Sequence, residues 1–153
     1  DNRPEPLEWT LAEATLDAPL HRLHHVIFDQ NSKFMNEFFK AKKYTETSVS
    51  PWTEDGARIV KYMIPKSALV KANMATENQK YTIKSGGGYV VGVRTDTPDV
   101  PFGSSFQTLV QFKLIPAQNK KQTIITITAG VEFSSSTWMK STITNGAKKG
   151  MMS

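Results

Sequence analysis

Hydrophobic and polar residues alternate along most of the chain between positions 45 and 133. This alternation predicts β-strands with one buried face, because successive side chains of a strand point to opposite sides of its sheet. The segments are rich in β-branched and aromatic residues and are bounded by Gly, Pro, Asn or Ser. They cover 45–50, 57–64, 75–85, 89–97, 105–115 and 122–133, after a shorter strand over 8–15.

Three other segments carry apolar residues at helical spacing. The first, over 17–30, has Asp17 as a candidate N-cap and Pro19 in its first turn. The second, over 31–44, offers Asn31 or Ser32 as its cap and has an apolar stripe of Phe34, Met35, Phe38 and Phe39. The third, over 134–153, begins with a run of serines, and we expect it to press its small residues onto a sheet.

Glycine and polar residues mark the connections between strands. The stretches SGGGY at 85–89 and PAQNKKQ at 116–122 predict hairpin turns. The element order is then strand, helix, helix, a run of antiparallel strands and a terminal helix, which is an α+β fold. No repeat or linker divides the chain, so we expect one domain over residues 1–153.

Alternation also assigns side chains to faces. In the strand over 105–115, Val110 and Phe112 share one face and Gln111 points to the other. The apolar faces of the strands, bent around the terminal helix, are expected to enclose one space. Its predicted lining consists of Tyr62, Ile64, Tyr89, Val91, Thr108, Val110, Phe112, Ile125, Ile127, Ala129, Trp138 and Thr142.

The pattern by itself is equally compatible with a solid core and with a cavity. Thr108, Ala129 and the glycines of the terminal segment are small where a solid core would need bulk. Few helices are available to fill one side of so long a sheet. These two features favour a cavity.

The stretch IPKSALVKAN, at 64–73, joins two strands and has an apolar centre between lysines. The simplest interpretation is that the apolar residues tuck beneath the loop. A lid over an apolar cavity, or a contact with lipid headgroups, is favoured, because loops normally expose polar residues. The residues assigned to this gate are Lys66, Ser67, Ala68, Leu69, Val70 and Lys71.

The formal net charge of +5 is unevenly distributed along the chain. Residues 1–60 carry 7 basic and 10 acidic side chains, whereas residues 61–153 carry 12 basic and 4 acidic ones. A solvated lysine-rich surface is one interpretation, and a face for an anionic partner is the other. Only Arg94 in the basic half is an arginine, so bidentate recognition of bases is disfavoured relative to an anionic membrane.

Motifs for catalysis are weak. His21, His24 and His25 lie on one helical segment, but neither a cysteine nor a paired acidic motif completes a metal site. The chain has no Gly-x-Ser-x-Gly, and SGGGY lacks the Lys-Ser/Thr of a phosphate loop. It also has no cysteine, no secretory signal and no membrane-spanning run. We expect a non-enzymatic domain of a reducing compartment without cofactor or metal.

Four motifs in order carry a family resemblance: FMNEFFKAKKYTETSVSPW at 34–52, RIVKYMIP at 58–65, DVPFGSSF at 99–106 and STWMKSTI at 136–143. Together they resemble the VASt domains, the StART-like sterol-binding modules of fungal Lam/Ltc proteins, animal Aster proteins and plant relatives. The resemblance covers about positions 16–153. The resemblance also implies that the ligand enters past the loop at 64–73. That loop does not match residue by residue, so its individual gate residues are chosen from its composition.

The resemblance implies a helix-grip fold, in which a curved antiparallel sheet wraps a long C-terminal helix and two short helices come early. It implies one sterol, such as ergosterol or cholesterol, in the cavity, and non-vesicular transfer between membranes. It also implies a cytosolic domain, anchored through other parts of a longer protein in the endoplasmic reticulum at contact sites. We expect a monomer that meets anionic membranes transiently and binds no nucleic acid.

Two questions stay open at this point. The hydroxyl of a sterol needs a polar partner. Tyr62, Tyr89 and Thr108 are candidates on the apolar faces, and Gln or Ser groups at the strand ends are the alternative. A different class of function is a cystatin-like β-rich association module that binds protein or nucleic acid through its basic face. Within the sterol-binding interpretation DVPFG is expected to be structural: its proline ends strand pairing, its glycine lets the backbone turn, and the next strand is directed toward the cavity.

Overall fold

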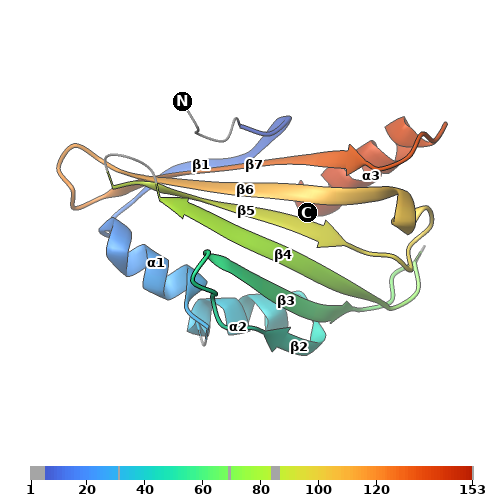
Figure 1. The fold of residues 1–153 in the computed structure, drawn as a ribbon, viewed down its shortest axis with the longest axis horizontal. Coiled ribbons are helices and arrows are strands. Elements are labelled where there is room, and N and C mark those ends of the chain that lie inside the picture. The colour runs from blue at the N-terminus through green and yellow to red at the C-terminus, as the bar shows by residue number, and fades with distance from the viewer. Residues whose placement is uncertain (1–5, 31, 69, 84–86, 153) are drawn as a thin grey trace.

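Seven strands form one antiparallel sheet in the computed structural model, which describes residues 6–30, 32–68, 70–83 and 87–152. The strand order is β1-β7-β6-β5-β4-β3-β2, so only β1 departs from chain order. Figure 1 shows the strands fanning out, as the twist of each strand requires. The strands are β1 (Trp9–Leu16), β2 (Thr45–Val49), β3 (Ala57–Ile64), β4 (Asn73–Ile83), β5 (Tyr89–Asp96), β6 (Phe106–Pro116) and β7 (Thr123–Phe133).

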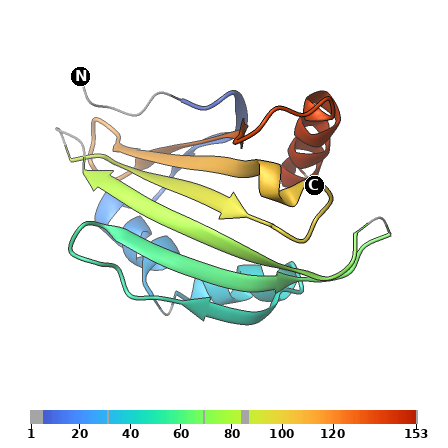
Figure 2. The ribbon, with the colours of Figure 1, turned by 45° about the vertical axis from the view of Figure 1, so that its right-hand side comes forward.

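The helices lie on one face of this sheet, which we call the helix-side face; the other is the outer face. α1 packs Phe28 against Tyr89 and Phe112, whereas α3 places the Lys148 ammonium 5.8 Å from the ring of Trp9. Figures 1 and 2 show α1 and α2 at the β2–β5 side and α3 beside β7. Their bounds are α1 (Leu20–Phe28), α2 (Lys33–Ala41), α3 (Lys140–Met152) and a short 3-10 turn, η1 (Gly103–Ser105).

The predicted α+β class, with two short early helices and a terminal helix on the sheet, is confirmed. Two apolar clusters hold the layers together. The first lies beneath α1 and includes Leu23, Phe28 and Leu114. The second lies beneath α2 and includes Met35 and Phe39 with residues of β3 and β4.

The helix caps follow only part of the sequence prediction. Ser32 caps α2, because its Oγ accepts a hydrogen bond from the Met35 N–H at 3.1 Å. Asp17 does not cap α1: the helix starts at Leu20, its N-cap is Pro19, and no side chain caps it. Asp17 instead accepts a hydrogen bond from the side chain of Gln122, so it ties the start of α1 to the turn between β6 and β7.

The predicted apolar stripe of α2 divides into two halves. Met35 and Phe39 are buried against the sheet, whereas Phe34 and Phe38 are exposed by 51% and 44%. Consecutive residues of a helix are rotated by about 100°. The sheet covers only one of the two adjacent rows, so the second row faces solvent.

The turn that contains DVPFG is built differently from the prediction. The left-handed residue is Phe102, with φ of 61°, and not the glycine. A Cβ on Gly103 would lie 2.1 Å from the Thr97 carbonyl oxygen and 2.9 Å from that of Pro98. A glycine is therefore required at position 103 because two backbone segments approach closely there. A left-handed backbone conformation does not require it.

The other two predicted turns are partly visible. Positions 85 and 86 of SGGGY lie outside the described residues, and beside the turn Ile83 pairs with Tyr89. The turn between β6 and β7 is confirmed: the Ala117 N–H donates to the Gln122 carbonyl at 2.9 Å. Within it, Asn119 Oδ1 accepts from the N–H groups of Lys121 and Gln122.

Replacing Gly103 by alanine is expected to lower the free energy of unfolding by about 2 kcal/mol, because the new methyl group would force two backbone segments apart. Urea denaturation measures this change. Gly146→Ala is the control, since its Cβ would meet nothing within 4 Å and α3 should gain helix propensity. A Gly103 variant as stable as the wild type would contradict the close-packing explanation.

Candidate functional site

Strand register brings most of the predicted cavity residues onto the helix-side face in cross-strand rows. One row is Val91, Phe112 and Ile127, and the next contains Val110 and Ala129. Of the predicted set, Tyr62, Tyr89, Val91, Ile125 and Ala129 are buried, whereas Ile64, Thr108, Val110, Phe112 and Ile127 are half-buried.

The terminal helix contributes differently from the prediction. Trp138 is 87% exposed and Thr142 is exposed, and none of residues 140–152 is buried. A Cβ on Gly146 or Gly150 would meet nothing within 4 Å, so the two glycines of α3 are not pressed onto the sheet. α3 lies alongside β7 and packs through longer side chains, which is why its glycines have no close partner.

α1 fills one end of the helix-side face. The Phe28 ring lies 6.1 Å from the ring of Tyr89 and 5.8 Å from that of Phe112. Toward the other end, Thr108, Val110 and Val131 stay half-buried although they point to the same side. We call these three residues the uncovered patch.

Beneath α1 and α2 runs a chain of buried polar groups that sequence reasoning missed. Arg58 is only 3% exposed and donates from Nη1 to the Phe28 carbonyl at 2.8 Å and from Nε to Gln79 Oε1 at 2.7 Å. The Gln79 amide donates to Glu77, whose other oxygen accepts from the Tyr62 hydroxyl. We call these four residues the polar chain.

The polar chain joins opposite charges through neutral groups. Burial lowers the pKa of Arg58, while Glu77 acts in the opposite direction. Burial, and then the charge of Glu77, raises the pKa of Tyr62 far above its usual range, so its hydroxyl keeps its proton and donates it. A signal was present in the sequence, since alternation puts Arg58 on the same face as Val60 and Tyr62.

Tyr62 and Tyr89, two of the candidates for binding a ligand hydroxyl, differ in whether their own hydroxyl already has a hydrogen-bond partner. The Tyr62 hydroxyl is already bonded to Glu77. The Tyr89 hydroxyl is buried without a hydrogen-bond partner among the described residues, and burial raises the pKa of this tyrosine. A buried hydroxyl without a partner carries a desolvation cost that a polar ligand group or a water could remove.

The predicted gate projects from the sheet between β3 and β4 (Figure 2). Lys66, Ser67, Ala68 and Lys71 are exposed, Val70 is half-buried, and Leu69 lies outside the described residues. The Ser67 N–H donates to the Val70 carbonyl at 2.8 Å. At its base, the Asn73 side chain donates to the Lys71 carbonyl at 3.0 Å.

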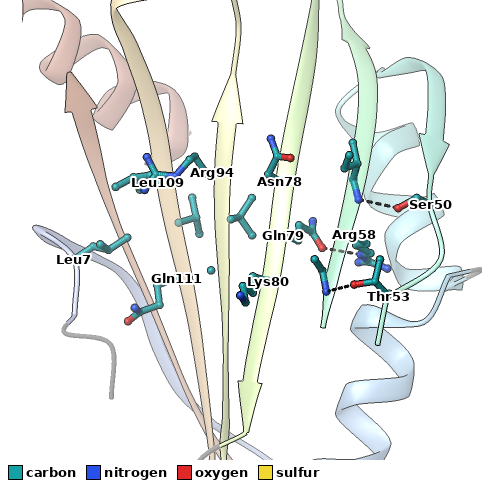
Figure 3. A pocket seen from close by; sticks show the side chains of 15 residues that line it. Leu7, Ser50, Thr53, Arg58, Asn78, Gln79, Lys80, Arg94, Leu109 and Gln111 are labelled. Carbon is teal, nitrogen blue, oxygen red and sulfur yellow. Dashed lines mark hydrogen bonds between the residues drawn. The ribbon is translucent and has the colours of Figure 1, made fainter. Parts of the chain in front are cut away.

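The outer face carries a pocket of about 570 Å³. It lies over the middle of β4, β5 and β6, where Gly92 contributes no side chain and leaves the sheet backbone bare. Figure 3 shows Leu109, Asn78 and Lys80 around this hollow. It is on the opposite side of the sheet from the uncovered patch, because side chains of Leu109 and Val110 point to opposite faces.

The three histidines do not converge on a common ligand position. His24 lies among the rings of Phe28, Tyr81 and Tyr89, and burial lowers its pKa. His25 contacts the Asp29 carboxylate at 3.1 Å. In the part of the chain that the structure describes, no three His, Cys, Asp or Glu side chains are arranged to hold a metal ion.

Residues 10–150 match the family model described as VAD1 Analog of StAR-related lipid transfer domain, or VASt. The chain belongs to the VASt family. The resemblance inferred from DVPFG and its companion motifs is thereby confirmed, and the domain is a lipid-transfer domain of a generally non-enzymatic kind. Among its described residues, no helix has the length and apolar character needed to cross a bilayer.

Three relatives show how far the similarity extends. The VASt domain is 30% identical over 138 residues to a C2 and GRAM domain-containing protein of Arabidopsis thaliana, covering 84% of this chain and 14% of that protein. It is 26% identical over 159 residues to an uncharacterized membrane protein of Schizosaccharomyces pombe, covering 97% and 21%. It is 28% identical over 108 residues to Protein Aster-A of Mus musculus, covering 65% and 15%. The chain thus spans 14–21% of the length of these relatives.

Replacing Arg58 by lysine is expected to lower the free energy of unfolding of the VASt domain by about 3 kcal/mol, since an ammonium cannot reproduce the fork that joins Phe28 to Gln79. Chemical denaturation checks this. Arg94→Lys is the matched control: Arg94 contacts Glu132 on the outer face at 3.1 Å, where both side chains are about half exposed. The Arg94→Lys change should lower the free energy of unfolding by less than about 1 kcal/mol. If the two variants lost the same free energy of unfolding, the hydrogen bonds of Arg58 in the polar chain would not be what stabilises the domain.

Proposed function

We propose that this VASt domain binds one sterol, such as ergosterol or cholesterol, on its helix-side face and carries it between membranes without vesicles. The uncovered patch supports this most directly. Three half-buried residues, Thr108, Val110 and Val131, continue the cross-strand rows of the helix-side face past Phe112 and Ile127, and Val110 packs against the cluster beneath α1. A rigid apolar ligand that covers this patch would gain roughly 25 cal/mol for each Å² of apolar surface removed from water. Membership of a lipid-transfer family favours this ligand over the partners of an association module.

We further propose that the Tyr89 hydroxyl is the polar partner of the sterol hydroxyl, directly or through a water. Tyr89 lies at the end of the helix-side face next to α1, and its buried hydroxyl has no partner among the described residues. The gate lies at the opposite end, after Ile64. A sterol that enters past the gate would reach Tyr89 with its polar end first.

The proposed partner of the gate is the anionic surface of a membrane. Lys66 and Lys71 are exposed on either side of its apolar centre, an arrangement that suits the boundary between headgroups and acyl chains. The proposed cellular setting is a cytosolic domain of a longer protein anchored in the endoplasmic reticulum, acting at membrane contact sites. The relative from Schizosaccharomyces pombe is named a membrane protein, which is compatible with that setting.

Native mass spectrometry tests the ligand and its face together. After incubation with cholesterol-containing liposomes, the wild-type domain should gain the mass of one sterol. Val110→Asp should reduce the bound fraction at least about tenfold, because it buries a charge against the ligand. Leu109→Asp, the neighbouring change on the outer face, should leave binding unchanged. Loss of binding in the Leu109 variant alone would move the ligand to the outer pocket, and no sterol in the wild type would end the proposal.

The role of the gate lysines is tested by the salt dependence of transfer. Lys66→Glu with Lys71→Glu should slow sterol transfer to vesicles that contain phosphatidylserine and remove the sensitivity to salt. The control is Lys120→Glu with Lys121→Glu, which makes the same charge change in the turn between β6 and β7, at the far end of the sheet. Equal slowing by both pairs would mean that overall charge matters and the gate does not.

A further inference from the structure

The outward-facing row of α2, Phe34 and Phe38, stays largely exposed, although the Phe38 ring lies 6.3 Å from that of Tyr44. Phe34 and Phe38 are four residues apart and therefore lie on one side of the helix. They are exposed by 51% and 44%, while Met35 and Phe39 secure the helix to the sheet from the next row. Packing of α2 thus needs only half of its aromatic and apolar side chains.

Charge around this row is strongly positive. Residues 33–43 contain Lys33, Lys40, Lys42 and Lys43 against one acidic residue, Glu37. The surrounding residues 1–60 carry more acidic than basic side chains, so the positive charge is concentrated at α2. An amphipathic helix that combines aromatic residues with lysines on its accessible surface has the composition of helices that lie in the interface of anionic membranes.

The C-terminal end of α2 also lies at the same end of the sheet as the gate. Thr45, which follows the helix at the start of β2, pairs with Met63. Met63 is the penultimate residue of β3, and the gate follows that strand. Figures 1 and 2 agree in placing the end of α2 and the projecting loop on the same side of the molecule. The end of α2 and the gate could therefore contact the same flat surface.

From these observations we propose that Phe34 and Phe38 of α2, with the neighbouring lysines, form a second docking surface for an anionic lipid membrane. The aromatic rings enter the headgroup boundary and the lysines face the phosphate groups. The inference deepens the proposed function, because it names a surface by which the domain meets the membrane with which it exchanges lipid. It does not require the gate to touch the same bilayer.

Flotation with sterol-free vesicles separates this inference from sterol binding. The wild-type domain should bind vesicles of phosphatidylcholine with about 30% phosphatidylserine and bind pure phosphatidylcholine poorly. Phe34→Ser with Phe38→Ser should weaken binding roughly tenfold. Ile124→Ser is the matched control, since Ile124 is 39% exposed on β7 and lies away from α2. Lys33→Glu with Lys40→Glu should also weaken binding, whereas Lys120→Glu with Lys121→Glu should not.

A labelling experiment avoids dependence on the stability of the serine variants. The chain contains no cysteine, so Phe34→Cys and Ile124→Cys each provide one attachment point for a polarity-sensitive fluorophore. The emission at position 34 should shift to shorter wavelength on addition of anionic vesicles, and that at position 124 should not.

Several outcomes would overturn the docking surface. Unchanged flotation of the double phenylalanine variant would do so, as would equal loss of binding in the two lysine pairs. A change in oligomeric state without a change in flotation would identify the row as a contact between copies. If sterol is still bound by the wild type while α2 proves irrelevant to flotation, only this inference fails; absence of sterol binding would affect the proposed function instead.

Discussion

The rest of the helix-side face depends on the position at which α1 ends, and the buried guanidinium of Arg58 fixes that position. It binds the carbonyl of Phe28 at 2.8 Å, the last residue of α1, where the helix exposes unpaired carbonyl groups and a partial negative charge. The indole of Trp52 donates to the same oxygen at 2.8 Å, and Arg58 lies 4.4 Å from its ring. A guanidinium this deep is tolerable because the polar chain satisfies its donors and carries the compensating charge of Glu77.

Anchoring α1 in this way divides the sheet into regions with different physical roles. Beneath α1 the side chains of Tyr89, Val91 and Leu114 are buried in one apolar cluster. Farther along the same strands Val110 and Thr108 are half-buried, so they are less covered than the residues of that cluster. A lipid-transfer domain needs both: packing that keeps the sheet folded without its ligand, and an apolar surface held available for it.

The predicted gate, the end of α2 and the turn around Phe102 lie at one end of the sheet. The gate, the end of α2 and the turn around Phe102 all follow from strand directions, because antiparallel register sends each of them to that edge. Phe102 has a positive φ and is 46% exposed, although both properties are unfavourable for an aromatic residue. The neighbouring Gly103 holds that conformation, since it fits against the Thr97–Pro98 backbone where no other residue could.

The sequence determined the strands, the helices, the α+β class and the family, because periodicity and local turn chemistry are properties of neighbouring residues. It also identified the side of each strand on which Val110 and Leu109 lie. Tertiary structure alone decided which of the equivalent rows of α2 is buried, that Trp138 faces solvent, and that Arg58 is enclosed. These outcomes depend on contacts between elements that are distant in sequence. Both rows of α2, Phe34 with Phe38 and Met35 with Phe39, are apolar, and only the row that the sheet covers becomes buried.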